Sequence, residues 1–275
     1  MPDIVVVGLQ EVIKSTVRAM LKNFFAGNAE ELTQEWIKVI VRALNHVNQF
    51  RSIFDKNEQY AYYQGQNMAG NFIGLFAKRS VLSRIKELYT CQIKAGLGPK
   101  NKGSCALRFR VDETTFAFFN CHLASGHGEV YRRTEMVRTI IKSAFAKAKS
   151  LPGAMHHNCL FLFGDLNFRV NIGNGAAREA IREKKIAHLL QFEELLQLRH
   201  AYEQHLAGVN DHLTAEVREA IMQDEIISEF KEGEITFPPT YKYDVGTHTY
   251  DTSRKQRVPS WTDRILYMDD SNKVE

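Results

Sequence analysis

The chain has 275 residues, of which 44% are hydrophobic and 25% charged, as in folded globular proteins and unlike disordered or fibrous ones. The sequence has no run of about 18 apolar residues, the length that spans a bilayer, and its start lacks the features of a signal peptide. The four cysteines show no CxxC spacing, which argues against a zinc site or a disulfide framework. We therefore expect a soluble, cytosolic protein with free thiols.

The net charge of +4 is unevenly distributed. Residues 176–234 contain 13 acidic and 7 basic side chains, so the rest of the chain carries a surplus of ten positive charges. Such a surplus indicates an anionic partner, which could be a nucleic acid, a membrane surface or a phosphorylated small molecule. Charge alone does not choose among the three.

Short apolar runs rich in branched and aromatic residues predict buried strands. In chain order they are Ile4–Val7, Asn71–Phe76, Cys105–Phe109, Thr115–Cys121, Cys159–Phe163 and Arg264–Tyr267. Apolar residues three and four apart predict helices over roughly Glu31–Phe50, Glu129–Ser150, Ala176–Gln197 and Leu213–Phe230. Because no repeat or linker divides the chain, we expect one layered domain in which helices cover sheets, of the α/β or α+β class.

Three of the predicted strands run directly into polar residues. The first is followed by Glu11, the fourth by His122, and the fifth by Asp165 and Asn167. Each alone has an ordinary explanation: a solvated loop carboxylate, a hydrogen-bonded core histidine, or a Gly-Asp-x-Asn turn. Together they have the chemistry of metal-assisted phosphate ester hydrolysis, since a carboxylate suits Mg²⁺ and an Asp can orient water.

A loop stiffened by Pro and Tyr residues precedes the last predicted strand. It presents Lys242, Arg254, Lys255 and Arg257, a set of cations that could hold two or more phosphates. The alternative for such a cluster is an ordinary solvated basic loop.

Six motifs extend over nearly the whole chain. They are Gly8-Leu9-Gln10-Glu11, Asn101-Lys102-Gly103, Asn120-Cys121-His122-Leu123-Ala124, Gly164-Asp165-Leu166-Asn167-Phe168-Arg169, Pro239-Thr240-Tyr241-Lys242-Tyr243-Asp244 and Pro259-Ser260-Trp261-Thr262-Asp263-Arg264. In content and order they resemble the catalytic domain of the inositol polyphosphate 5-phosphatases, within the DNase I-like endonuclease–exonuclease–phosphatase superfamily. The last two motifs in tandem are the most specific to that family.

The resemblance implies an α+β fold, a four-layer α/β/β/α sandwich with two mostly antiparallel sheets. It implies one catalytic domain over residues 1–275, with a helical surface insertion near residues 201–224. By similarity, Glu11 is a Mg²⁺ ligand and Asp165 positions and activates the attacking water. Asn167 contacts the scissile phosphate, and His122 supports the phosphoryl oxygens.

The resemblance also assigns residues that bind substrate. Tyr241, Lys242, Lys255 and Arg257 match the residues that hold the phosphate beside the scissile one. Asn101 and Lys102 lie in a loop that would face the inositol 1-phosphate and the membrane. Three residues of the last motif are interpreted as packing and as an internal ion pair that supports the site: Trp261, Asp263 and Arg264.

The chain also departs from the family pattern. Only seven residues precede Gly8, and the chain stops eleven residues after Arg264 without the family's Ser-Asp-His segment. We therefore expect the domain to be incomplete at both ends, with apolar sheet surface and strand edges exposed. The family's acidic–amide pair is altered to Glu193-Glu194, to which we assign no role at this stage.

The expected activity is Mg²⁺-dependent removal of the 5-phosphate from phosphoinositides, such as phosphatidylinositol 4,5-bisphosphate, or from soluble inositol polyphosphates. We expect a monomer that acts at the periphery of membranes from the cytoplasm. The alternative is a catalytically inactive phosphoinositide-binding module, since the Asp-His pair is absent. A nuclease is disfavoured because the basic loop resembles that of inositide enzymes, and no aromatic stacking platform accompanies the basic residues. We thus expect no nucleic acid partner.

Overall fold

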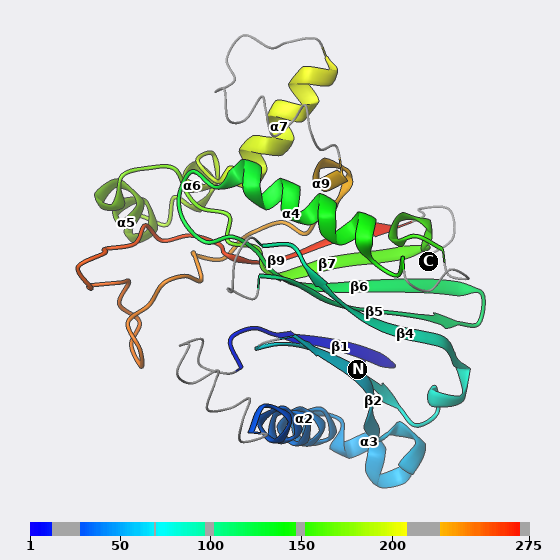
Figure 1. Cartoon of the computed structure of the whole chain (residues 1–275). Helices are drawn as coiled ribbons and strands as arrows, with labels where there is room; N and C mark the ends of the chain where they lie inside the picture. Colours follow the sequence, from blue (N-terminus) through cyan, green and yellow to red (C-terminus); the bar gives the residue numbers. More distant parts are fainter. Residues whose placement is uncertain (13–27, 69, 97–101, 147–151, 208–225, 270–275) are drawn as a thin grey trace. The chain divides into compact units, whose positions relative to one another are not determined.

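The computed structural model describes residues 1–12, 28–68, 70–96, 102–146, 152–207 and 226–269 (Figure 1). The strands are β1 (Ile4–Leu9), β2 (Tyr60–Met68), β3 (Asn71–Lys78), β4 (Ile85–Lys94), β5 (Gly103–Val111), β6 (Thr114–His122), β7 (Cys159–Asp165), β8 (Lys231–Glu232) and β9 (Asp263–Asp269). The helices are α2 (Asn28–Val47), α3 (Gln49–Phe54), α4 (Val130–Ser143), α5 (Asn174–Arg182), α6 (Ile186–Leu190), α7 (Glu194–Leu206) and α9 (Ile226–Glu229), with short 3₁₀ turns at Lys56–Glu58, Leu82–Arg84 and Ala154–His156.

The strands form two sheets, with orders β1-β3-β2 and β4-β5-β6-β7-β9-β8. The registers are antiparallel between β1 and β3, β2 and β3, β4 and β5, β5 and β6, and β8 and β9. Two mostly antiparallel sheets with helices confirm the predicted α+β class. In the part of the chain that is described, no helix combines the length and the hydropathy needed to cross a bilayer.

The chain divides into two compact units. The first comprises Met1–His122, Ile140–Gly164 and Met268–Glu275, and the second comprises Leu123–Thr139 and Asp165–Tyr267. Two of the four boundaries, immediately after β6 and just before the end of β7, fall within polar motifs.

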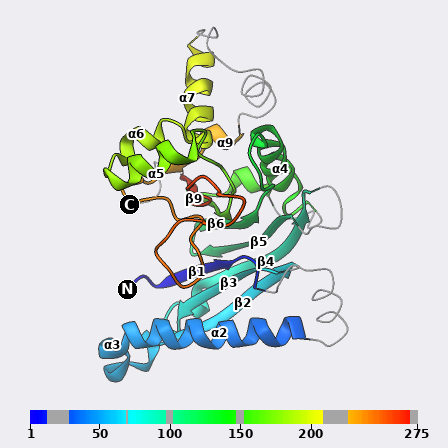
Figure 2. The same ribbon diagram turned by 90° about the vertical axis from the view of Figure 1, so that its left-hand side faces the viewer.

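The first unit is built around β3, whose residues are all buried. On one face of its sheet, the apolar side of α2 packs through Ile37 against Phe72 and Phe76, and the helix runs along this sheet (Figure 2). On the other face, β3 packs against the second sheet, where Leu75 shares a core cluster with Leu107. These clusters supply the hydrophobic stabilisation of the unit.

A further layer of the first unit is formed by the end of α4 and the residue segment after it. The Phe145 ring contacts the rings of Tyr89 on β4 and Phe119 on β6, with centroids 6.2 and 5.8 Å apart. Within this unit the layers therefore follow the predicted order of helix, sheet, sheet and helix.

The core of the second unit centres on Trp261, which is fully buried. Val170, Ala177 and Leu189 pack with it in one cluster that α5 and α6 cover. Its indole Nε1–H donates to the carbonyl of Phe237 (3.0 Å), so the polar edge of the ring is satisfied inside the core.

The six predicted strands are confirmed, and the structure extends each by two to four residues. Three strands were missed: β2, β4 and β8. β2 reads YAYYQGQNM, without a run of aliphatic residues, and it pairs with β3 across a bulge near Tyr62. Its place is fixed by the neighbouring strand rather than by local preference.

A single helix over Ala176–Gln197 is wrong. Lys184 has a positive φ of 58°, which ends α5, and Glu193 accepts from the Leu196 N–H as the N-cap of α7. The helix predicted over Glu31–Phe50 is likewise interrupted, because the buried Asn48 side chain donates to the Glu58 carbonyl between α2 and α3.

The remaining helix predictions are only partly covered. Residues 147–150 of the helix predicted over Glu129–Ser150 lie outside the described residues, and α4 itself ends at Ser143. Most of the helix predicted over Leu213–Phe230, and of the insertion near 201–224, also lies outside them. The described parts are the end of α7 and α9. All four cysteines are free thiols, as expected.

Candidate active site

The ends of β1, β6 and β7 meet in the first unit at Asn120. Its Nδ2 donates to the carbonyls of Leu9 (3.1 Å) and Phe72 (2.8 Å), and its Oδ1 accepts from Gln10 Nε2. Gly164 has a φ of +114°, and a Cβ there would lie 2.7 Å from Asn120 Oδ1, so only glycine fits. The structure thus joins the strand ends that carry the polar motifs.

Two candidate site residues follow these strand ends. Glu11 comes two residues after β1, with an exposed side chain and a φ of 56°. His122 is the last residue of β6, is 9% exposed, and lies opposite Gly103 in the antiparallel register. Lys102 immediately precedes β5, and its carbonyl accepts from the backbone N–H groups of Ala95 and Gly96 (3.2 and 3.3 Å). Asn101 lies outside the described residues.

The exposed Glu11 carboxylate is compatible with Mg²⁺. Mg²⁺ usually binds through one or two carboxylates and keeps several waters, which a substrate phosphate can replace. Among the residues that the structure describes, no group of three or more His, Cys, Asp or Glu side chains is arranged to enclose a metal ion. An exposed carboxylate at a strand end fits an open Mg²⁺ site better than a closed structural one.

In the second unit, the segment after β7 is fixed by its backbone. The Asp165 carbonyl accepts from Leu123 N–H (2.9 Å), and the Thr262 carbonyl accepts from the N–H groups of Leu166 (2.8 Å) and Asn167 (3.2 Å). Asn167 has a φ of 59° and is buried, and its Nδ2 donates to the Leu123 carbonyl (3.2 Å). Asp165 and Asn167 are therefore held by the segment that follows His122 and by the last motif.

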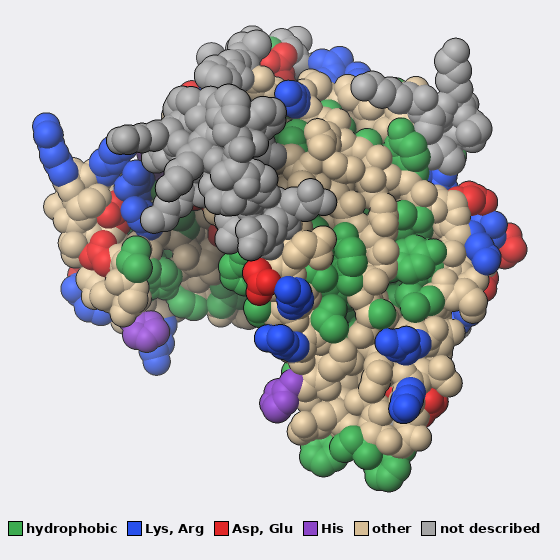
Figure 3. Space-filling view, turned by 60° about the horizontal axis from the view of Figure 1, so that its bottom comes forward, with side chains coloured by type: hydrophobic (Ala, Val, Ile, Leu, Met, Phe, Trp, Pro, Cys, Tyr) green, Lys and Arg blue, Asp and Glu red, His purple; other side chains and the backbone are tan. Residues whose placement is uncertain are grey.

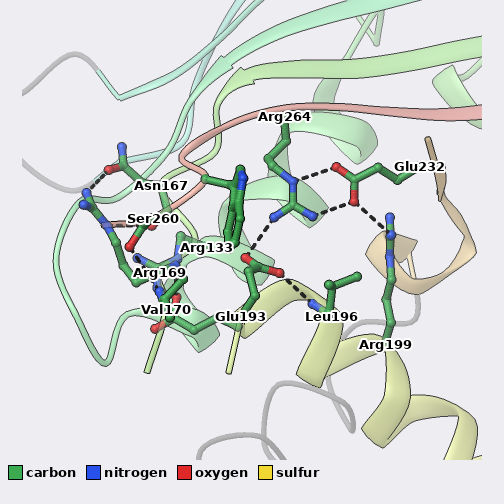
Figure 4. Close-up of polar contacts among 12 residues, drawn as sticks. Arg133, Asn167, Arg169, Val170, Glu193, Leu196, Arg199, Glu232, Ser260 and Arg264 are labelled. Atoms are coloured by element: carbon green, nitrogen blue, oxygen red, sulfur yellow. Dashed lines mark hydrogen bonds and ion pairs between the residues drawn. The ribbon is translucent and has the colours of Figure 1, made fainter. Parts of the chain in front are cut away.

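Arg169 connects this segment to the basic loop. Its guanidinium donates to the Asn167 side-chain oxygen and, through Nε, to the Asn167 carbonyl (3.1 Å), as Figure 4 shows for the side chains. The same guanidinium lies 4.6 Å from the centroid of the Tyr241 ring, a cation–π contact. Tyr241 and Ser260 exchange two backbone hydrogen bonds, and Ser260 Oγ accepts from Val170 N–H (3.2 Å).

The basic loop is organised by the buried carboxylate of Asp251. Its Oδ2 accepts from the backbone and guanidinium N–H groups of Arg257 (3.0 and 3.1 Å), and Oδ1 accepts from Ser253 N–H (3.1 Å). Its own N–H donates to the Lys242 carbonyl (2.8 Å). Hydrogen bonds from Ser253 and then Arg257 hold the pKa of Asp251 below its usual range. Lys242 and Arg257 are partly exposed and Lys255 is exposed, so the cations face solvent.

A buried ion network in the second unit centres on Arg264 (Figure 4). Arg264 pairs with Glu193 (2.8 Å) and bidentately with Glu232 (2.6 and 2.5 Å), which also pairs with Arg199 (3.3 Å). Burial raises the pKa of Glu193 despite its neighbour Arg264. The interpretation of Arg264 as part of an internal ion pair agrees with this network, although Asp263 is exposed and the carboxylates come from α7's N-cap and β8.

The structure adds residues that sequence reasoning left without a role. Arg133, Arg169, Glu194 and Asp251 are buried polar residues that hold the two motif segments and the basic loop. The altered Glu193-Glu194 pair was the one sequence signal that marked part of this set. Nothing in the local sequence around Arg133 distinguishes it from the neighbouring surface arginine Arg132.

Comparison with known proteins identifies the class to which this fold and these motifs belong. The chain matches the family described as Endonuclease/Exonuclease/phosphatase family 2 over residues 1–275. It is 30% identical to the inositol polyphosphate 5-phosphatase domain of SPsynaptojanin, solved with inositol (1,4)-bisphosphate and a calcium ion; the TM-score is 0.71, with coverage of 98% of this chain and 68% of that one.

Curated relatives give the same result. Polyphosphatidylinositol phosphatase INP53 of Saccharomyces cerevisiae is 32% identical over 272 residues, and inositol-1,4,5-trisphosphate 5-phosphatase 1 of Schizosaccharomyces pombe is 32% identical over 268. The matches cover 97% and 96% of this chain but only 21% and 22% of those proteins. The chain therefore belongs to endonuclease/exonuclease/phosphatase family 2, among the inositol polyphosphate 5-phosphatase domains. Members named in this way are phosphoric monoester hydrolases.

Proposed function

We propose that this chain carries the catalytic machinery of a Mg²⁺-dependent phosphatase that removes the 5-phosphate of phosphoinositides or soluble inositol polyphosphates. The relatives' names support this substrate class. The main structural support is Arg169, which joins Asn167 to the Tyr241 ring and so braces the catalytic segment against the basic loop. Substrate could then be oriented by one phosphate while another reacts.

In the proposed reaction, Asp165 orients a water molecule in line with the leaving inositol oxygen and accepts a proton from that water. Asn167 donates from its amide to a phosphoryl oxygen, and His122 supports the same group. Mg²⁺ held by Glu11, when bound, would neutralise charge on the transferring phosphoryl group. The protein's own contribution is thus alignment of water and phosphate, which can account for a large part of the barrier reduction.

The basic loop would select the ring position. Lys242, Lys255 and Arg257, with Tyr241, would bind the phosphate next to the scissile one, with Arg257 kept in place by Asp251. Arg suits bidentate phosphate contacts, whereas Lys acts as a point charge. A lipid substrate would bring the protein to the anionic cytoplasmic face of a membrane, with Lys102 and Asn101 near the 1-phosphate.

The test is phosphate release by the full protein from phosphatidylinositol 4,5-bisphosphate and from inositol 1,4,5-trisphosphate, with Mg²⁺ and with EDTA. We expect Mg²⁺-dependent release that Asp165→Asn abolishes while head-group binding persists. The matched control is Asp112→Asn, at the exposed turn between β5 and β6, which should stay active. Binding of head groups without release at any Mg²⁺ concentration would instead indicate an inactive phosphoinositide-binding module.

The loop is tested separately with Lys255→Ala combined with Arg257→Ala. KM should rise more for a substrate that bears a 4-phosphate than for one that lacks it. Equal increases for both substrates would exclude the proposed contact.

A further inference from the structure

Arg133 on α4 is a fully buried cation that touches both site segments of the second unit. Its Nη1 donates to the carbonyls of Ala124 (3.2 Å) and Gly126 (2.9 Å), in the segment that follows His122. The guanidinium also lies 5.2 Å from the centroid of the Phe168 ring, in the segment that follows β7. The Arg133 side chain therefore contacts both the segment after His122 and the segment after β7. The Asn167 side chain also joins these two segments, through its hydrogen bond to the Leu123 carbonyl.

Glu194, the first residue of α7, completes this arrangement. Its Oε2 accepts from Arg133 Nη2 and from the Arg169 backbone N–H (2.8 Å), and its own N–H donates to the Arg169 carbonyl (2.9 Å). Both backbone groups of Arg169 are thus held by Glu194. The Arg169 side chain in turn binds the carbonyl and the side-chain oxygen of Asn167.

The Arg133–Glu194 pair is charged and buried, so its geometry must be good enough to offset the cost of removing both charges from water. Both side chains are at most 1% exposed, so each ion depends on the other and on its hydrogen bonds for stabilisation. Burial raises the pKa of Glu194 to about 7 despite the attraction of Arg133. Other charged or titratable groups face the pair, namely His127 and Glu129 just before α4, Arg169, and Glu193 beside Glu194.

We propose that Glu194 is a positioning residue for Asn167: it fixes the two segments between which the Asn167 amide is held. This inference rests on the proposed phosphatase function. The resemblance predicts an amide at this place in the chain, where this protein has a carboxylate. An amide could accept one hydrogen bond, but it would leave the buried Arg133 without its counter-charge.

The consequence is that activity depends on the ionisation of Glu194. The ionised carboxylate holds Arg133 and the Arg169 N–H with charge-assisted hydrogen bonds, and protonation weakens both. The effect on stability has the opposite sign. Because the pKa of Glu194 is higher in the folded state than in the unfolded chain, the contribution of this group to stability increases on acidification from about pH 7 towards pH 4.5.

The experiment compares the wild-type full protein with Glu194→Gln. The control is Glu183→Gln, which removes an exposed carboxylate paired with Lys185 on the surface of the same unit. Turnover of inositol 1,4,5-trisphosphate and thermal unfolding are measured from pH 5.5 to 8.5 with Mg²⁺. At pH 8 we expect kcat of Glu194→Gln to fall by at least about tenfold, with KM unchanged within about twofold, since a small misplacement of a reacting group is costly.

The pH dependence separates positioning from a merely structural role. As the pH falls through 7, the kcat of wild type should approach that of Glu194→Gln, while the unfolding temperature of wild type rises relative to the variant. His127, whose pKa is lowered by burial, is present in both proteins, and Glu194 is not among the groups that shift its pKa. Glu194→Asp, which keeps the charge, should retain the pH-dependent limb of kcat.

The inference would be overturned if the ratio of kcat between wild type and Glu194→Gln were independent of pH. It would also be overturned if this ratio followed the unfolding temperature. A rise in KM with kcat unchanged would do the same. If Glu194→Gln does not fold, the Glu194→Asp profile decides: loss of the limb near pH 7 contradicts the inference. Failure of the proposed function is distinct, because wild type itself would then release no phosphate at any pH.

Discussion

Asp251 shows how one buried carboxylate can organise a loop of cations. It holds the backbone at Lys242, Ser253 and Arg257, and it pairs with the Arg257 guanidinium. Arg178 adds donation to the Asp251 carbonyl (2.7 Å), which ties the loop to α5. A loop of cations without this anion would have to hold its positive charges together against their mutual repulsion.

Asp251→Asn should therefore weaken substrate binding while leaving chemistry largely intact. The amide keeps the shape but loses the charge that fixes Arg257, so we expect KM to rise by about fivefold or more, with kcat within about twofold. Because the folded pKa of Asp251 is depressed, its contribution to stability is present above about pH 4 and is lost as the pH falls further. The difference in unfolding temperature between wild type and Asp251→Asn should thus shrink below pH 4. A difference that stays constant down to pH 3 would contradict the ionic role.

At the residue scale, the candidate site was only partly predictable from the sequence. Glu11, His122 and Asp165 were candidates from the sequence because each follows an apolar run that predicts a strand, a purely local signal. Arg133 and Asp251 could not, because their partners are backbone carbonyls and N–H groups brought close by the fold. The role of a buried polar residue depends on its hydrogen-bond partners, which the sequence alone does not reveal.

At the scale of elements, the predictions were right where the local hydrophobic pattern determines the secondary structure. They were wrong where contacts with neighbouring elements determine it. β3 is buried, β5 is mostly buried, and each contains a largely apolar run that predicts a strand. β2 is polar and exists because β3 supplies its partner, as the paired register from Tyr60 to Met68 shows. The break in the helix predicted over Ala176–Gln197 was missed because Lys184 adopts a positive φ, which is uncommon for lysine and is not indicated by the sequence.

The end of β7 offers a test of how an element positions the site. Gly164→Ala would place a Cβ in steric clash with the Cys121 carbonyl oxygen and with Asn120 Oδ1, which would be 2.7 Å away, at a φ that disfavours alanine. We expect a loss of about 2 kcal/mol or more in unfolding free energy, through strain and displacement of Asn120. Urea denaturation measures it.

Gly175→Ala is the matched control for this substitution. Gly175 lies in α5 with nothing within 4 Å of its Cβ position, so alanine should stabilise the protein by about 0.5–1 kcal/mol. If Gly164→Ala proved as stable as Gly175→Ala, the close approach of β7 to Asn120 would be wrong.

At the scale of the whole molecule, apolar surface is distributed unevenly. Large exposed hydrophobic side chains gather on α3, at Phe50, Ile53 and Phe54. Figure 3 views the molecule with the α2 and α3 side brought forward, and it shows hydrophobic side chains interspersed with Lys and Arg. Tyr60 at the start of β2 lies opposite Lys78, whereas Leu9 at the end of β1 lies opposite Phe72, so α3 belongs to the sheet end remote from Glu11.

The four free thiols all belong to the first unit and can report whether that unit stays closed. Cys105, Cys121 and Cys159 are buried, and Cys91 is partly exposed. Burial raises the pKa of Cys121 to about 12, and it raises the pKa of the other three thiols as well. Since the thiolate is the reactive form, burial protects these thiols in two ways: it blocks access of the reagent, and it keeps the thiol protonated.

With an aromatic disulfide reagent at pH 8, we therefore expect one thiol of the native protein to react quickly and three to wait for opening of the unit. In 6 M urea, roughly the concentration that unfolds small domains, all four should react together. Cys91→Ser should remove the fast phase and leave the slow one, whose rate then measures local opening of the two packed sheets. Adding inositol 1,4,5-trisphosphate should slow this phase only if binding stabilises the first unit. Fast reaction of two or more thiols in the native Cys91→Ser protein would show that the core around Leu107 and Phe109 is not closed as described.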